Sequence, residues 1–186
     1  RETGEDVKVL PYPVSSPRRK IFISHSSEDE FIVRAFMDKI LLLGCGLKPD
    51  DIFCTLDPTA IRTGDDFREQ IIINMEGSDY ILLFISENYK GIEVCGNELG
   101  AAWAFRDKRV LPFVLPNVQF CQMGFLNVVK QGAELLERSK LDEFYEEVCK
   151  KYSLALDWKN FNKHKDDFVN TVASLISQNK HCLTTV

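Results

Sequence analysis

The feature of this sequence that most constrains its fold is an apolar run at residues 80–85, Tyr-Ile-Leu-Leu-Phe-Ile. Polar residues do not alternate with apolar ones in this run, so neither face of the strand that it predicts is suited to water. A strand covered on both faces is typical of the centre of a parallel sheet with helices on either side. The run therefore predicts an α/β domain.

Shorter strands and amphipathic helices alternate around this central run. This alternation is typical of βαβ units with right-handed crossovers, which place the strands in one parallel sheet. Beyond Pro116 the pattern is weaker, and residues 117–138 predict mostly loop with a short edge strand near Glu134–Leu136. The other predicted strands are 21–23, 51–55 and 109–115, and the predicted helices are 28–43, 65–77, 97–106, about 140–152 and 165–179.

One domain accounts for most of the 186 residues. Residues 1–19 hold three prolines and no periodicity, and they predict a linker or a disordered lead-in. We expect the domain to span residues 20–180, with a tail at 181–186. Because the chain begins with Arg1 rather than Met, it is consistent with a piece cut from a longer protein.

Composition excludes several classes of function. The net charge of −5 argues against a broad nucleic-acid-binding surface, so we expect no direct nucleic-acid partner. The sequence contains no apolar run long enough to span a membrane and no signal peptide. None of its six cysteines forms a C-x-x-C pair, and it has three histidines, so we expect no metal site. These features predict a protein of the reducing cytoplasm.

The ligand site of an open parallel sheet lies at the carboxyl ends of its strands. That rule selects residues 24–27, 56–66 and 86–97, which follow the first three predicted strands. In the first loop, Ser27 and Glu30 have the spacing of a capping box, so Ser27 is expected to cap the helix. Ser24 and His25 precede it and are better placed to face a ligand, although a single histidine is more often structural than catalytic.

The third loop leads into a helix that carries a candidate acid. Asn97 is a good N-cap residue, which places Glu98 in the first helical turn. The positive end of a helix favours an ionised carboxylate there. Acidic residues are common in first helical turns, so position alone does not assign a function to Glu98.

Four segments in order resemble the Toll/interleukin-1 receptor (TIR) family. Each motif is loose on its own, but four in the right order make chance a poor explanation, and the resemblance covers roughly residues 20–116. The first segment is similar to the opening box of bacterial members, the second to the second strand and the "BB loop", the third to the third strand, and the fourth to the helix bearing the catalytic glutamate. They are Lys20–Asp29, Ile52–Thr55 with Ile61–Asp66, Tyr80–Tyr89 and Cys95–Ala102.

The resemblance implies a fold, an activity and a set of site residues. The fold is a flavodoxin-like, five-stranded parallel sheet with helices on both faces. The activity is that of an NAD⁺ glycohydrolase (NADase), which gives nicotinamide and either ADP-ribose or a cyclic isomer, in bacterial anti-phage defence or NAD-depletion signalling. NAD⁺ is the substrate, and no cofactor is required. The resemblance gives the catalytic role to Glu98 and substrate binding to Ser24, His25, Ser26, Ser86 and Tyr89.

The resemblance also implies self-association, in which the loop Leu56–Asp66 of one protomer covers the pocket of the next. One departure concerns Val94, because catalytic members often carry Trp immediately before the cysteine that matches Cys95. This departure disfavours cyclisation more than cleavage. Two alternatives remain: a non-catalytic scaffold that binds other TIR domains, and a hydrolase similar to nucleoside deoxyribosyltransferases.

Overall fold

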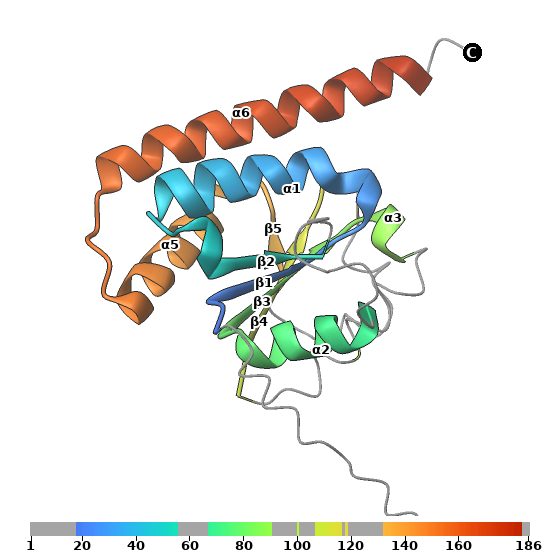
Figure 1. Ribbon diagram of the computed structural model, residues 1–186. Helices are drawn as coiled ribbons and strands as arrows, with labels where there is room; N and C mark the ends of the chain where they lie inside the picture. The colour runs from blue at the N-terminus through green and yellow to red at the C-terminus, as the bar shows by residue number, and fades with distance from the viewer. Residues whose placement is uncertain are drawn as a thin grey trace, which may run out of the picture.

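A five-stranded parallel sheet forms the centre of the domain (Figure 1). The computed structural model describes residues 18–55, 67–90, 100, 107–116, 118 and 132–183. The strand order is β2-β1-β3-β4-β5, and every neighbouring pair is parallel. The strands are β1 (Ile21–Ser24), β2 (Ile52–Cys54), β3 (Tyr80–Ile85), β4 (Arg109–Val114) and β5 (Ala133–Glu134).

The apolar run at residues 80–85 forms the middle strand, β3. It pairs with β1 on one side and with β4 on the other, and all six of its residues are buried. The predicted five-stranded, flavodoxin-like α/β fold is therefore confirmed. The strand order reverses between β1 and β3. Strand β2 lies beyond β1 on one side, and β4 and β5 lie beyond β3 on the other.

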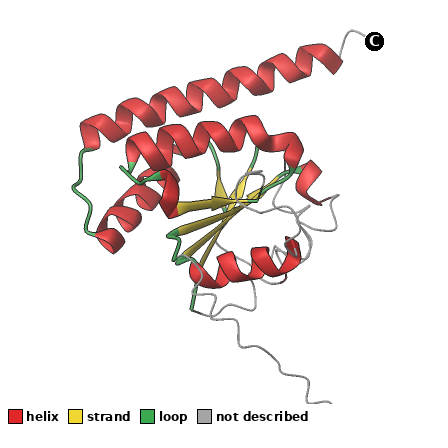
Figure 2. Ribbon diagram, viewed as in Figure 1, coloured by secondary structure: helices red, strands yellow, loops and turns green. Residues whose placement is uncertain are grey.

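Helices cover both faces of the sheet (Figure 2). The larger core places Ile21, Ile23, Leu82 and Phe84 against one helical layer, and the smaller core places the intervening Phe22, Ile81 and Leu83 against α2 (Phe67–Gly77). This division follows from the alternation of side chains along a strand. The layer on the larger core consists of α1 (Glu30–Phe36), its π-helical continuation η2 (Met37–Gly44), α5 (Arg138–Tyr152) and α6 (Trp158–Leu183).

Helix α6 lies across α1 and η2 on the outside of this layer (Figure 1). Its close approach depends on Gly44. A Cβ added at this position would lie 2.9 Å from the Lys39 carbonyl oxygen and 3.0 Å from Phe161 Cδ2. A side chain here would therefore push the two helices apart.

Most element boundaries agree with the sequence prediction, and two differ: β5 is Ala133–Glu134 rather than 134–136, and α6 starts early. Helix α6 begins at Trp158, whereas the pattern predicted a start at 165. The reason is a cap: the Asn160 backbone N–H donates to Asp157 Oδ1 at 2.9 Å. Phe161, which precedes the predicted helix, is fully buried in the core. The predicted helix at 97–106 lies, apart from residue 100, outside the described residues.

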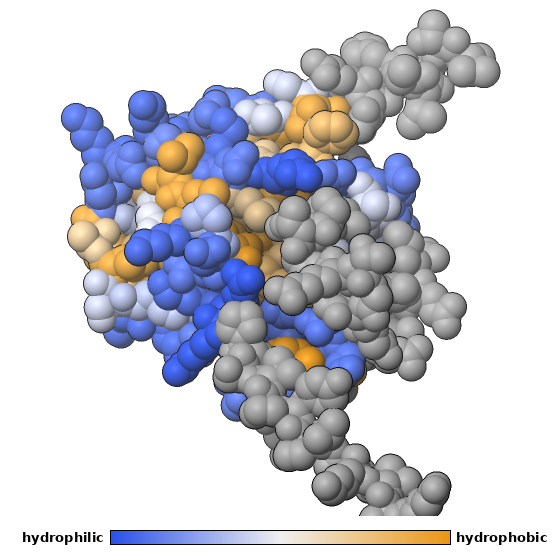
Figure 3. Space-filling view, viewed as in Figure 1, coloured by the Kyte–Doolittle hydropathy of each residue, from blue (hydrophilic) through white to orange (hydrophobic). Residues whose placement is uncertain are grey.

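The visible surface is mainly hydrophilic, with separate apolar areas (Figure 3). Large exposed hydrophobic residues include Phe31 on α1 and Leu43 on η2, which are 74% and 54% exposed. Both lie within the helix predicted at 28–43, but they point away from the core. Within the described part of the chain, every helix is too short or too polar to cross a membrane.

Candidate functional site

The reversal of strand order between β1 and β3 defines the candidate site. Loops that leave the carboxyl ends of two such strands diverge, and the space between them binds ligands in this class of fold. Ser24 ends β1, and Ser86 follows the last residue of β3. The short helix α3 (Glu87–Lys90) starts directly after Ser86. The first and third predicted loops therefore start from adjacent strands, as the sequence indicated.

A hydrogen bond joins these two strand ends. The hydroxyl groups of Ser24 and Tyr89 lie 2.8 Å apart, although the residues are 65 positions apart in sequence. Ser24 is fully buried and Tyr89 is 2% exposed. A bond between two buried hydroxyl groups is protected from competition with water. It holds α3 against the end of β1.

A buried carboxylate, which sequence reasoning missed, holds the same turn from the other side. Asp29 accepts hydrogen bonds from the Ser86 hydroxyl and, at 3.2 Å, from the Asn88 side-chain amide. Ser86 Oγ in turn accepts the Tyr89 backbone N–H at 2.9 Å. Hydrogen bonds to a charged acceptor are stronger than neutral ones. Asp29 therefore fixes the position of the β3 exit relative to the start of the first helix.

His25 is buried beside the end of β2. Its Nδ1 lies 2.8 Å from the Ser26 carbonyl oxygen, and its Nε2 lies 3.1 Å from Cys54 Sγ. Because a carbonyl only accepts, the proton belongs on Nδ1 and the Nε2 lone pair faces the thiol. Burial lowers the pKa of His25 below its usual range. The imidazole is therefore neutral at neutral pH.

Ser26 has the capping role that the sequence pattern predicted for Ser27. The prediction that Ser27 caps the helix is wrong: Ser26 Oγ accepts the Glu28 backbone N–H at 3.3 Å, and Ser27 is exposed. A short 3-10 turn, Ser27–Asp29, precedes α1 and shifts the cap by one residue. Ser26 is fully buried, and its hydroxyl caps the start of this turn.

The structure brings together all five predicted substrate-binding residues, and none is more than 5% exposed. Together with the Asp29 carboxylate, they form a buried polar cluster of hydroxyl groups and one neutral imidazole, the polar floor of the candidate site. The described residues contain no cluster of three or more His, Cys, Asp or Glu side chains arranged to hold a metal ion. Glu98, Val94 and the loop Leu56–Asp66 lie outside the described residues.

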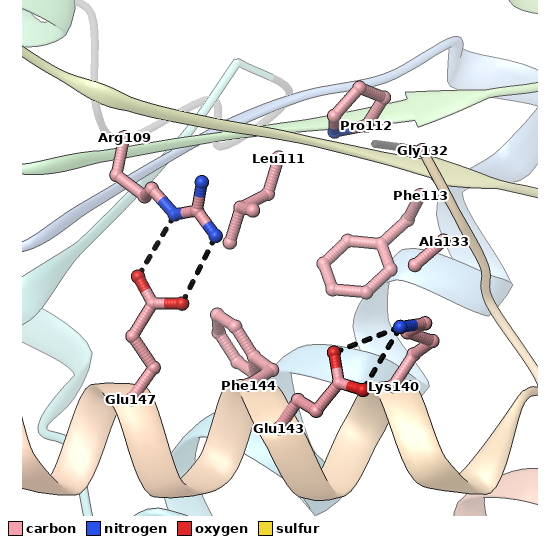
Figure 4. A pocket seen from close by; sticks show the side chains of 10 residues that line it. All are labelled: Arg109, Leu111, Pro112, Phe113, Gly132, Ala133, Lys140, Glu143, Phe144 and Glu147. Atoms are coloured by element: carbon pink, nitrogen blue, oxygen red, sulfur yellow. Dashed lines mark hydrogen bonds and ion pairs between the residues drawn. The ribbon is translucent and has the colours of Figure 1, made fainter. Parts of the chain in front are cut away.

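A cavity of about 500 Å³ lies elsewhere, between β4 and α5 (Figure 4). Its charged groups are paired: Arg109 binds Glu147 at 3.0 and 3.3 Å, and Lys140 binds Glu143 at 2.9 and 3.0 Å. Arg109 is the first residue of β4, so the cavity reaches the amino end of that strand. It is therefore separate from the candidate site at the carboxyl ends of β1 and β3. The apolar lining consists of Leu111, Pro112, Phe113, Ala133 and Phe144.

The fold is an α/β domain whose candidate ligand site lies at the strand-order reversal. Comparison with known proteins gives the family: the TIR domain model matches residues 21–149, and the chain belongs to that family. An uncharacterized Bacillus subtilis protein, YddK, is 31% identical over 151 residues, which cover 81% of this chain and 56% of that protein. The chain thus matches only about half the length of this relative.

Two solved structures are similar in fold. The TIR domain of the Toll-related receptor TRR-2 from Hydra magnipapillata has a TM-score of 0.53 at 18% identity, covering 70% of this chain and 95% of that one. The TIR domains of the activated Roq1 resistosome, which recognizes the pathogen effector XopQ, have a TM-score of 0.46 at 17% identity. That match covers 85% of this chain and 99% of the other. At this identity the receptor domain supports the fold alone.

Proposed function

We propose that this TIR domain cleaves the nicotinamide–ribose bond of NAD⁺. The observation that carries the proposal is the convergence of Ser24, Ser86 and Tyr89 at the reversal of strand order, in a chain of the TIR family. His25 follows Ser24 in the chain, and its ring faces Cys54 at the end of β2. Sites at this position in open α/β sheets bind nucleotides. The polar floor supplies hydrogen-bonding groups in a buried setting, where they discriminate between ligands most strongly.

Glu98 is the proposed catalytic residue. When the bond between nicotinamide and C1′ breaks, its electron pair leaves with nicotinamide, and the ribose becomes an oxocarbenium-like cation. A carboxylate next to that cation lowers the barrier, as in glycoside hydrolysis. A well-placed electrostatic group of this kind contributes about 3–4 kcal/mol. Water then adds to C1′ and loses a proton, which gives ADP-ribose without a cofactor.

The described residues give this mechanism a fixed floor. Asp29 and Ser86 hold the exit of β3, and Ser24 holds Tyr89, so the loop that leads toward Glu98 starts from a defined place. Orienting the reacting groups lowers the entropic part of the barrier. We propose that Ser24, His25, Ser26, Ser86 and Tyr89 line the substrate pocket beneath the ribose and nicotinamide.

The product and the assembly follow from two further sequence features. Val94 offers no aromatic surface to hold the adenine base, so we expect ADP-ribose rather than a cyclic isomer as the main product. The loop Leu56–Asp66 contains proline and glycine, and we propose that it closes the pocket of a neighbouring protomer. Such an enzyme fits NAD⁺ depletion in bacterial cytoplasm during anti-phage defence.

The alternative is a scaffold that binds other TIR domains without catalysis, favoured by Val94 and disfavoured by Glu98. Incubation of the purified chain with NAD⁺, followed by chromatography, separates the two. The proposal expects nicotinamide and ADP-ribose to appear in equal amounts, at a rate that increases with enzyme concentration. A scaffold leaves NAD⁺ intact at every protein concentration. A parallel incubation with a deoxynucleoside tests the deoxyribosyltransferase-like alternative, which predicts release of the base.

A further inference from the structure

Cys54 and His25 form a thiol–imidazole pair at the carboxyl edge of β2 and β1. Cys54 is the last residue of β2, and its register partner on β1 is Ile23, two residues before His25. The 3.1 Å separation of Cys54 Sγ from His25 Nε2 is hydrogen-bond distance. The substrate-binding role proposed for His25 does not require this contact with sulfur.

The geometry gives His25 the features of a general base. Its Nδ1–H donates to the Ser26 carbonyl, which orients the ring and leaves Nε2 to accept the Cys54 S–H. A nucleophile within reach of a base that is itself oriented by a third group is the arrangement that activates thiols in enzymes. The neutral imidazole is in the protonation state that can take the thiol proton.

Burial has the largest effect on the pKa of His25 and lowers it, and nearby carboxylates oppose this effect. Asp29 and Glu30 both raise the pKa of His25, while burial and Arg34 lower it. An imidazolium formed at Nε2 therefore has two carboxylates nearby. The thiolate that remains on Cys54 is stabilised by the new positive charge beside it.

Two other cysteines in the same chain lack this setting. Cys45 and Cys149 belong to the larger core, as Cys54 does, and burial raises the pKa of the Cys45 and Cys149 thiols. The exposed fractions are 8% for Cys54, 4% for Cys45 and 1% for Cys149. All three thiols have low solvent accessibility. The larger difference between them is therefore the imidazole of His25, which lies next to Cys54.

We propose that Cys54 is a thiol-modification site, at which His25 promotes the reaction of the sulfur with small organic disulfides. Cys54 transfers its proton to His25 Nε2, and its sulfur attacks one sulfur of the disulfide. A new S–S bond forms as the old one breaks. The departing thiolate leaves with the electron pair of the old bond and takes from His25 the proton that Cys54 gave up. Cys54 is oxidised to a mixed disulfide, and half of the reagent is reduced to a thiol.

The test is the rate of mixed-disulfide formation at each cysteine of the native chain. The protein is incubated with 2-hydroxyethyl disulfide, quenched with acid, and analysed by peptide mass spectrometry. We expect Cys54 to react at least 10-fold faster than Cys45 and Cys149. Equal rates at the three positions in the wild-type protein overturn the proposal without any variant.

The variant His25→Asn separates the base from simple accessibility. Asparagine can still donate to the Ser26 carbonyl, but it offers no basic nitrogen. General-base catalysis contributes about 100-fold or more, so Cys54 should slow by about that factor while Cys45 and Cys149 keep their rates. The matched control is His164→Asn on α6, which should leave all three rates unchanged. An unchanged Cys54 rate in folded His25→Asn protein, with folding checked by circular dichroism, contradicts the role of His25.

Discussion

Replacing Phe36 by alanine should destabilise the domain more than any exposed substitution on the same helix. Phe36 is fully buried where the helical layer meets the sheet. Four aromatic rings surround it, with centroids 5.1 Å (Phe84), 5.3 Å (Phe113), 5.6 Å (Phe168) and 6.0 Å (Phe144) away. The substitution removes a ring that joins β3, β4, α5 and α6.

The expected cost follows from burial and from these contacts. Removing a buried Phe side chain costs about 3–5 kcal/mol, which combines lost transfer free energy and the cavity left behind. Because aromatic pairs add to the area term, we expect a value in the upper part of this range, about 4 kcal/mol. At roughly 2–4 °C per kcal/mol for a domain of this size, Tm falls by about 8–16 °C.

Urea unfolding followed by circular dichroism measures this cost. The matched control is Phe31→Ala, which makes the same chemical change five residues earlier in α1 at a position that is 74% exposed. It should change the free energy of unfolding by less than about 0.5 kcal/mol. A loss below about 2 kcal/mol for Phe36→Ala, or equal losses for both variants, refutes this account of the packing.

Three further predictions concern the site and its assembly. Tyr89→Phe removes the 2.8 Å hydrogen bond to Ser24 and should lower the free energy of unfolding by about 1 kcal/mol; an unchanged urea midpoint contradicts the role given to this bond. Because the pKa of His25 is lowered in the folded state, the unfolded chain binds the proton first, so stability is lost as pH falls below about 6.5. His25→Asn should lose less stability than the wild-type protein between pH 7.5 and 5.5, and parallel curves argue against a neutral buried imidazole. Specific NADase activity should rise with protein concentration, whereas constant activity on dilution, with a monomer by light scattering, contradicts pocket closure by a neighbour.

The sequence predicted the sheet well because its signals are local. The run at residues 80–85 has no polar face, so only a central strand can accommodate it, and the strand bounds agree with the prediction. The place of the candidate site could also be predicted, because the carboxyl edge is a property of the topology. Ser24 and Ser86 could be placed there before their contact partners were known.

Side-chain direction at the helix starts could not be predicted in the same way. Three consecutive acidic residues, Glu28, Asp29 and Glu30, begin the first helix, and all three are reasonable first-turn residues. Only Asp29 turns inward to Ser86, because the short 3-10 turn rotates the chain before α1 begins. The partner of Asp29 in this contact, Ser86, is 57 residues away in the sequence, so no local pattern reveals it.

The late start predicted for α6 has a different cause, because the sequence does contain signals for a start near residue 158. Asp157 is a good N-cap, and Phe161, Lys165, Phe168 and Val172 follow at helical spacing. All four are buried in the structure. The polar residues between them, at positions 159–167, hid the pattern.

The central claim is that a carboxylate on this TIR domain breaks the nicotinamide–ribose bond, and nicotinamide release by Glu98→Gln tests it most directly. The substitution keeps the shape of the side chain and removes its charge. Glu146→Gln makes the same change at an exposed position of α5 and serves as the matched control. The account predicts that the control releases nicotinamide at the wild-type rate, while Glu98→Gln, folded and with an unchanged Tm, slows by at least about 100-fold. Near wild-type release by Glu98→Gln contradicts the account.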